Sequence, residues 1–217
     1  MTSIYDPIFD VPPRALFPWG SSPFHVRGAT YRDSMARAET LLAPRGLRVA
    51  DVFRQHGDPA LEAFMAQRFS AMEWYDVGPA VHVGPILAKA YGVTLAQHMR
   101  DAAGVYANSA LRGFTAVLLK LLSNEAVATW IPRMSTWYHD FGAIETVTAG
   151  ERHVRGVRSG MPVFVVQGWS ILAMHFTEHI LANTGAKNPR VHMLDVEPDG
   201  SRAGCPLYRV RFEVRWG

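Results

Sequence analysis

The sequence has a single cysteine, Cys205, in 217 residues. One thiol excludes an internal disulfide framework and any zinc site built on clustered cysteines, and it is typical of reducing compartments. The chain also lacks an uninterrupted apolar run of about 18 residues, so no segment is predicted to span a membrane. A membrane protein and a cysteine-rich zinc module are therefore excluded.

Basic residues are in small excess and scattered. The net charge is +3, and no basic run occurs. We therefore expect no nucleic-acid partner. The first ten residues carry Asp6 and Asp10, no basic residue and no apolar run, which is not the pattern of a signal peptide. A soluble, cytoplasmic protein is expected.

Apolar residues are plentiful: 48% of the chain is hydrophobic and 19% is charged. That composition supports a well-packed core. Residues 1–26 hold five prolines, which disfavour a helix. We predict a proline-rich N-terminal arm over residues 1–26, laid over a single domain that spans residues 27–217.

The closing stretch, Leu207 to Trp216, alternates apolar and charged side chains. Side chains alternate across a strand, so this pattern predicts one buried face and one face in water. The apolar segment from Met161 to Asn183 supplies the covering layer, as a helix from Val163 with a buried stripe at Trp169, Leu172, Phe176 and Ile180.

Helical spacing dominates the first two thirds of the chain. Trp74-Tyr75-Asp76 opens a segment in which Pro79 and Pro85 predict a broken or kinked helix. The other predicted helices cover residues 28–42, 47–55, 60–69, 94–110, 114–122 and 125–138, with caps at Asp58, Thr94 and Ser123.

The period changes from helix to strand after Gly142. Residues 143–148 and 152–158 predict a hairpin around Ala149-Gly150. Residues 190–197 predict a further strand that ends in a turn at Pro198-Asp199-Gly200. The fold class is therefore α+β, with a helical N-terminal two thirds followed by an antiparallel sheet covered by one long helix.

Five short motifs recur in a known group of domains: Val26-Arg27-Gly28, Trp74-Tyr75, Trp137-Tyr138 through Gly142, Gly168-Trp169 and Tyr208 to Trp216. With these motifs the chain resembles the small-molecule-binding domains named after four-vinyl reductase. Over residues 24–216, the likeness is greatest to an uncharacterised paralogous family of myxobacteria. A more distant likeness is to haem nitric oxide/oxygen-binding sensors and a vesicle-tethering subunit.

This resemblance implies a homodimer-forming domain with a cavity between its helices and its sheet, and no one chemistry. The lone Cys205 disfavours the zinc that several relatives hold near the last strands. The Tyr-x-Ser-x-Arg grip of the haem sensors is absent. At the position of their haem-ligating histidine, this chain has Trp130-Ile131-Pro132.

Aromatic and histidine side chains provide the candidate ligand-binding residues, because such residues line apolar pockets and offer a polar tip. His82 lies between Pro79 and Pro85, where a helix break would expose a site, and His98 lies on the 94–110 helix. A packed core is the alternative for each aromatic residue, and a partly exposed helix face is the alternative for His98. The candidates are Trp74, Tyr75, His82, His98, Tyr106, Trp137 and Trp169.

The stretch His175-Phe176-Thr177-Glu178-His179 matches the His-x-x-Glu-His pattern of inverted zinc proteases. His175 and His179 share a helix face, as metal ligands must. A catalytic zinc also needs a third ligand, and the acids that follow lie on or beside strands. A solvent-facing helix surface is the favoured interpretation, and a metal at these histidines is the alternative.

No phosphate loop, nucleophile elbow or paired carboxylate motif occurs, so no stretch specifies a reaction. The leading hypothesis is a non-catalytic sensor that binds a small apolar or aromatic molecule. One alternative is a haem-binding gas sensor or haem enzyme ligated by His82, His98, His139 or His175. Another is a protein-interaction module with a solid core and an exposed apolar patch. The identity of the cofactor, if any, stays open.

Overall fold

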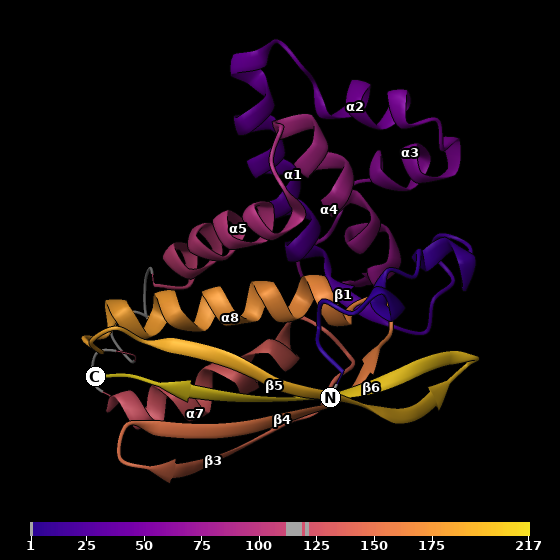
Figure 1. Ribbon diagram of the computed structural model, residues 1–217. Helices are drawn as coiled ribbons and strands as arrows, with labels where there is room; N and C mark the ends of the chain where they lie inside the picture. Colours follow the sequence, from indigo (N-terminus) through magenta and orange to yellow (C-terminus); the bar gives the residue numbers. More distant parts are fainter. Residues whose placement is uncertain (1, 112–118, 120–121) are drawn as a thin grey trace. The chain divides into compact units, whose positions relative to one another are not determined.

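The computed structural model describes residues 2–111, 119 and 122–217 (Figure 1). The chain divides into two compact units, each described by itself. The sheet unit comprises residues 1–10, 99–136 and 141–217, and the helical unit comprises residues 11–98 and 137–140. Helix α5 (Leu95–Ala110) runs from one unit into the other. The predicted helix over residues 114–122 lies largely outside the described residues.

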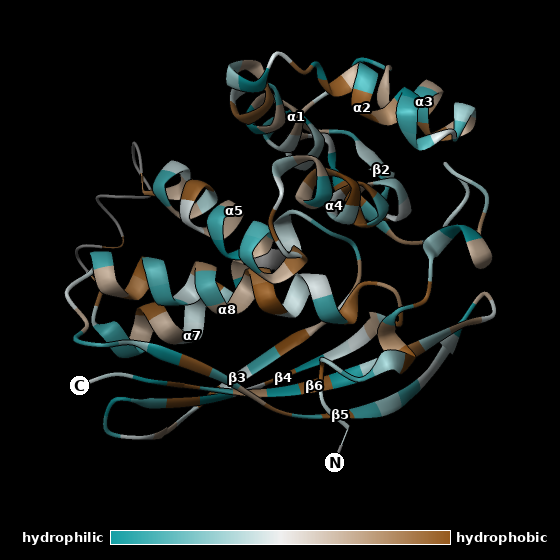
Figure 2. Ribbon diagram, turned by 45° about the horizontal axis from the view of Figure 1, so that its top comes forward, coloured by the Kyte–Doolittle hydropathy of each residue, from teal (hydrophilic) through white to brown (hydrophobic). Residues whose placement is uncertain are grey.

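A four-stranded antiparallel sheet in the order β3-β4-β6-β5 forms the base of the sheet unit. Its strands are β3 (Ile144–Gly150), β4 (His153–Pro162), β5 (Arg190–Arg202) and β6 (Cys205–Arg215). Val154 pairs with Val214 in the register of β4 and β6. The predicted hairpin is present, but its turn lies at Glu151-Arg152 rather than at Ala149-Gly150, which belong to β3. The alternation of the last strand is confirmed, and Figure 2 shows the hydropathy changing along the strands.

Helix α8 (Val166–Asn183) packs on β5, and α7 (Asn124–Met134) packs on β3, β4 and α8 (Figure 1). The α+β prediction is confirmed, and α7 adds a second helix to the covering layer. Together these elements enclose one apolar core. Its buried members are Ala107, Leu119, Val127, Ala128, Ile131, Val154, Ile180, Leu181, Ala186, Val191, Phe212, Val214 and Trp216.

The buried face of α8 differs from the predicted stripe. Trp169, Leu172 and Phe176 are only half-buried, and Ile180 alone of the predicted stripe is fully enclosed. The other enclosed positions are Val166, Ser170, Ile171, Thr177 and Leu181. Because the helix is apolar around most of its circumference, periodicity cannot select one side.

The turn predicted at Pro198-Asp199-Gly200 is wrong. Strand β5 continues through it with a register shift, and the chain reverses at Ala203 and Gly204. These two residues have φ of 50° and 80°, which a two-residue hairpin with the sheet's own twist requires. Asp199 instead uses its carboxylate within the unit, accepting from the Gly160 amide at 2.8 Å.

Helices α1 (Gly28–Leu42), α2 (Val49–His56), α3 (Pro59–Met65) and α4 (Val77–Tyr91) build the helical unit. Asp58 caps α3, accepting from the amides of Ala60 and Leu61, as predicted. Thr94 and Ser123 also accept from the first turns of their helices.

Two predicted helix ends and one predicted helix break are wrong. Helix α3 ends at Met65 rather than residue 69, and α7 ends at Met134 rather than residue 138. Helix α4 is one continuous helix through both prolines. Pro79 lies in its first turn, where no intrahelical N–H bond is lost. Asp76 begins this helix by accepting from the Gly78 amide.

A small β-structure holds the base of the helical unit. Strand β1 (His25–Arg27) pairs with β2 (Trp74–Asp76), and Val26 bridges to His139 in the 137–140 segment. A Cβ on Gly28 would meet the Ser70 carbonyl oxygen at 2.0 Å, so only glycine fits at this crossing. Three of the short motifs quoted for the resemblance therefore meet here.

The proline-rich N-terminal segment makes contacts with other elements along its length. Thr2 bridges to Val196, and Phe9 packs edge-on to Tyr208 with ring centroids 4.9 Å apart. Further along, the amides of Gly20 and Ser22 donate to the Asp76 carboxylate. Among the described helices, none is long and apolar enough to cross a bilayer.

Candidate functional site

The predicted site residues fall into both units, and the contacts within each unit do not gather them into one pocket. Trp74, Tyr75, His82, His98 and Trp137 belong to the helical unit. Tyr106, Trp169, His175 and His179 belong to the sheet unit. The cavity predicted beside the 161–183 helix stays a prediction.

Trp74 and Trp137 are linked by Arg27. The Arg27 guanidinium carbon lies 3.8 Å from the centroid of the Trp74 ring, and Nε donates to the Trp137 carbonyl at 3.4 Å. Trp74 is 40% exposed and Trp137 is 60% exposed. The stacked arginine gives both residues a structural role at the edge of the β1–β2 pair.

Tyr75 belongs to an aromatic cluster with Tyr31, Phe64 and Phe69. Its ring meets Phe69 with centroids 4.9 Å apart, and Tyr31 stacks on Phe69 at 4.4 Å. The Tyr75 hydroxyl accepts from the Ser70 amide at 2.9 Å. This cluster makes Tyr75 part of the core of the helical unit.

His98 is a buried histidine near the start of α5, with 5% of its surface exposed. Its Nδ1 lies 3.3 Å from Nη1 of Arg37, and its ring lies 5.4 Å from Tyr91. Because a guanidinium can only donate, Nδ1 is the acceptor and the proton of a neutral ring is on Nε2. The alternative of a partly exposed helix position is therefore wrong for His98, which is buried and makes a polar contact.

His82 faces His56 across two helices. Their Nε2 atoms lie 3.2 Å apart, and the Trp19 ring lies 5.2 Å from the His82 ring. Burial, and then the charge of His56, lower the pKa of His82 below its ordinary value. Of the predicted break or kink, the break is absent, so His82 lies on a continuous α4 that has Pro85 inside it.

The residues of the His-x-x-Glu-His motif make contacts with other elements of the sheet unit. Glu178 accepts from the Val191 amide at 3.0 Å and lies 3.0 Å from Nδ1 of His175. Arg100 donates to Nε2 of His175 at 3.4 Å, so both ring nitrogens have partners. The His179 ring lies against Gly104, where an added Cβ would be 3.2 Å from Nε2.

Glu178 thus binds the start of β5 and orients His175. Both roles are structural. Among the described residues, no group of three or more potential ligands gathers around a common point.

Trp169 belongs to a cluster of side chains that was not predicted from the sequence. The Trp169 ring lies beside the Phe141 ring, with centroids 5.9 Å apart, and the Arg158 guanidinium carbon lies 6.0 Å from the centroid of the Trp169 ring. Arg158 is only 6% exposed, and burial lowers its pKa to about 9. Tyr106, on α5, is half-buried in the same unit.

Gly142 completes this cluster. Its φ is +77°, and a Cβ there would lie 2.7 Å from Nε of Arg158 and 2.9 Å from Sδ of Met161. Close approach of the chain to the arginine therefore requires glycine. The cluster brings a buried cation together with a tryptophan, a phenylalanine and a thioether. Such a set suits a ligand with an apolar body and one anionic group.

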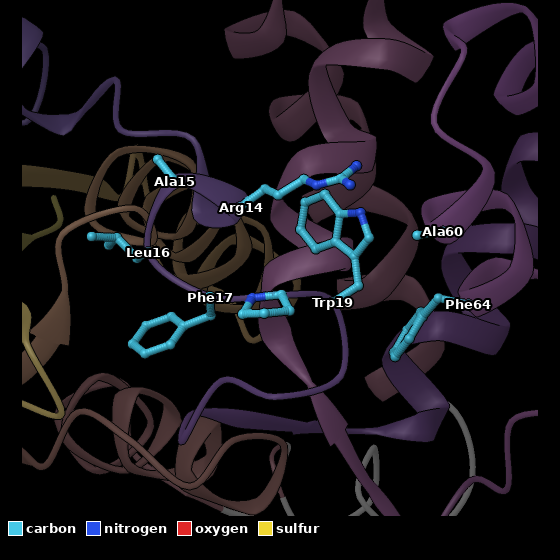
Figure 3. Close-up of a pocket in the computed structure, with 8 residues that line it drawn as sticks. Arg14, Ala15, Leu16, Phe17, Trp19, Ala60 and Phe64 are labelled. Carbon is cyan, nitrogen blue, oxygen red and sulfur yellow. The ribbon is translucent and has the colours of Figure 1, made fainter.

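Three surface pockets are described, and none is lined by a predicted site residue. The first, of about 690 Å³, is lined by Arg14 to Trp19 with Ala60 and Phe64 (Figure 3). The second, of about 850 Å³, lies beside Arg32 and residues 65–73. The third, of about 260 Å³, lies between residues 2–5 and β5.

Comparison with solved structures identifies the fold. The H-NOX protein from K. algicida matches with a TM-score of 0.56 at 9% identity, over 88% of this chain and 96% of that chain. The H-NOX protein from S. oneidensis, in the Fe(II)NO ligation state, matches with a TM-score of 0.51 at 10% identity, over 87% and 99%. This chain has an H-NOX-like fold.

A further H-NOX-fold match is an oxygen-binding H-NOX domain related to soluble guanylate cyclases. Its TM-score is 0.51 at 7% identity, over 86% of this chain and 89% of that chain. Identities this low show the shared H-NOX fold alone. No protein-family model matches the chain, and no curated protein matches it.

The H-NOX likeness raises the question of an iron ligand. Trp130, Ile131 and Pro132 lie on α7, and none of them carries a nitrogen or sulfur that binds iron. If the resemblance places the ligating position here, as expected from the sequence, these residues do not fit a haem ligand. His98 and His139 are buried imidazoles of the right chemistry, and both belong to the helical unit.

Proposed function

We propose that this chain is a non-catalytic sensor domain that binds a small molecule with an apolar or aromatic body and one anionic group. Arg158, beside Trp169, is the observation that carries the proposal. A guanidinium holds a carboxylate or phosphate through parallel hydrogen bonds, and a buried site strengthens that attraction. The H-NOX-like fold supports a ligand-binding role.

The anionic group gives the ligand its orientation. Trp169, Phe141 and Met161 offer apolar contacts to the rest of the molecule. The same proposal includes four further points. The chain is related to four-vinyl-reductase domains, and residues 27–217 form a single domain. The protein is a homodimer, and it is located in the cytoplasm. Light scattering of the purified protein would test the homodimer.

The role of Arg158 is tested with pairs of compounds, each an acid and its methyl ester. Thermal-shift assays would compare aromatic and long-chain carboxylic acids with their methyl esters. We expect each binding acid to have at least tenfold higher affinity than its ester. R158M should abolish that preference, and R158K should retain part of it because lysine keeps the charge but not the planar fork.

The matched control is Arg155, an exposed arginine on the same strand. R155M should bind as the wild type does. Equal binding of acids and esters, or an R158M variant that still prefers acids, would contradict the assignment of Arg158.

Haem binding is the second candidate, because structures with this fold are haem proteins. His98, His139 or His82 would have to supply the axial ligand in place of the residues of α7. An absorption spectrum after haem addition tests this. A Soret band that a single His→Ala change removes supports a haem protein, and its absence leaves the proposal above as the better account.

A further inference from the structure

Two histidines from separate helices face each other in the helical unit. His56 is the last residue of α2, and His82 lies in the middle of α4. Their Nε2 atoms are 3.2 Å apart. The two rings meet edge to face, with centroids 5.3 Å apart and planes inclined by 63°. This separation is that of a hydrogen bond between the two rings, so the two Nε2 atoms are neighbours on adjacent helices.

We propose that His56 and His82 form a two-imidazole site for a divalent late transition-metal ion such as Zn²⁺ or Ni²⁺. Metal–imidazole bonds are about 2.0–2.1 Å long. Two such ligands are therefore roughly 3.4 Å apart at a tetrahedral angle and roughly 2.9 Å apart at a right angle. The observed separation lies between these values, so binding requires only a small adjustment of the rings.

The surroundings allow an ion to enter. His56 is exposed and His82 is half-buried, so one side of the pair faces solvent. The Asp58 carboxylate acts favourably on a positive charge at His82, whereas Arg14 opposes it. Arg14 is paired with Asp58, which offsets part of its repulsion.

Trp19 connects the pair to the pocket of Figure 3. Its indole lies against the His82 ring and also lines that pocket, and its Nε1 donates to Asp58 at 3.0 Å. Because no third protein ligand joins the pair among the described residues, water must complete the coordination. We therefore expect moderate affinity and exchange with free metal. An ion held by both rings would link α2 to α4.

Tag-free protein titrated with Zn²⁺ by calorimetry tests the proposal. We expect one ion per chain, and at least a tenfold loss of affinity in H56A and in H82A. The double variant H56A/H82A should be no weaker than either single variant, because one missing ligand already destroys a bidentate site. Two independent weak sites would instead give additive losses and overturn the proposal.

Two histidine variants serve as controls. H192A removes an exposed imidazole on β5, and H175A removes a histidine of the His-x-x-Glu-His motif. Both should bind Zn²⁺ as the wild type does. Loss of binding in H175A with retention in H82A would contradict the His56–His82 assignment.

A thermal-shift readout separates metal binding from folding defects. In EDTA, H82A should melt close to the wild type, and Zn²⁺ should raise the melting temperature of the wild type only. An equal Zn²⁺-induced rise in H82A would overturn the proposal.

Discussion

Replacement of Asp76 by alanine should destabilise the helical unit strongly. The Asp76 side chain begins α4 and fixes the N-terminal segment at the same time. Its Oδ2 accepts from the amides of Gly20 at 2.8 Å and Ser22 at 3.3 Å, and its Oδ1 accepts from the Gly78 amide at 2.8 Å. Asp76 is 4% exposed, so water cannot easily replace it.

The magnitude follows from these three hydrogen bonds. A hydrogen bond to a charged group contributes about 1.5–3 kcal/mol, and bonds that share one acceptor are not additive. We therefore expect D76A to lose roughly 3–5 kcal/mol of unfolding free energy. For a chain of this size that corresponds to a fall in Tm of roughly 6–20 °C, at about 2–4 °C per kcal/mol.

Urea unfolding followed by circular dichroism measures this loss. D76N should fall between the wild type and D76A, because its amide keeps one acceptor oxygen but turns donors toward backbone N–H groups. D10A, at an exposed aspartate, should change the stability by less than about 0.5 kcal/mol. A loss in D76A below about 1 kcal/mol would refute the role assigned to the carboxylate.

Three further predictions concern packing, pH and the motif glutamate. G156A should cost about 1–3 kcal/mol, because its Cβ would lie 2.2 Å from the Phe212 ring, whereas G150A, with nothing within 4 Å, should be nearly neutral in urea unfolding. Equal effects would contradict this packing. Burial raises the pKa of Asp58, but hydrogen bonds outweigh burial and lower it to about 2. Stability should therefore be lost as the pH falls from about 4 to about 2, and D58N should flatten that part of an acid titration. E178A should lose about 1–3 kcal/mol and increase amide exchange at the start of β5; unchanged exchange there would count against it.

Local patterns predicted the secondary structure where one side of an element is apolar. The alternation from Tyr208 to Trp216 predicted β6, since a strand buried on one face must alternate. The cap at Asp58 was also predicted correctly, because it depends on neighbouring residues only. The pairing of the two hairpin strands was predicted too, although the turn lies two residues after the predicted Ala149-Gly150. The α+β class could therefore be reached from the sequence, whereas the H-NOX-like fold was identified by comparison with solved structures.

Features that depend on distant residues could not be predicted. The buried side of α8 is set by its neighbours in space, because the helix itself is apolar around most of its surface. His56 and His82 lie 26 positions apart in the sequence, on two different helices. No local pattern encodes that contact.

Arg158 could have been identified from the sequence. Val154, Gly156 and Arg158 occupy alternate positions of β4, and all three are buried. Alternation therefore placed an arginine on the inward face, which is a rare position for a charge. The nearby Gly142 marks the change from helical to strand period in the sequence, and its φ of +77° also allows the chain to pass close to the guanidinium.

Native mass spectrometry of the purified protein, before and after denaturation, tests the ligand-binding proposal most directly. We expect a fraction of the wild type to carry a small molecule with an acidic group, released on unfolding and absent from R158M. Wild-type protein that has only the mass of the chain, and shows no thermal shift with any acid tested, would contradict the account.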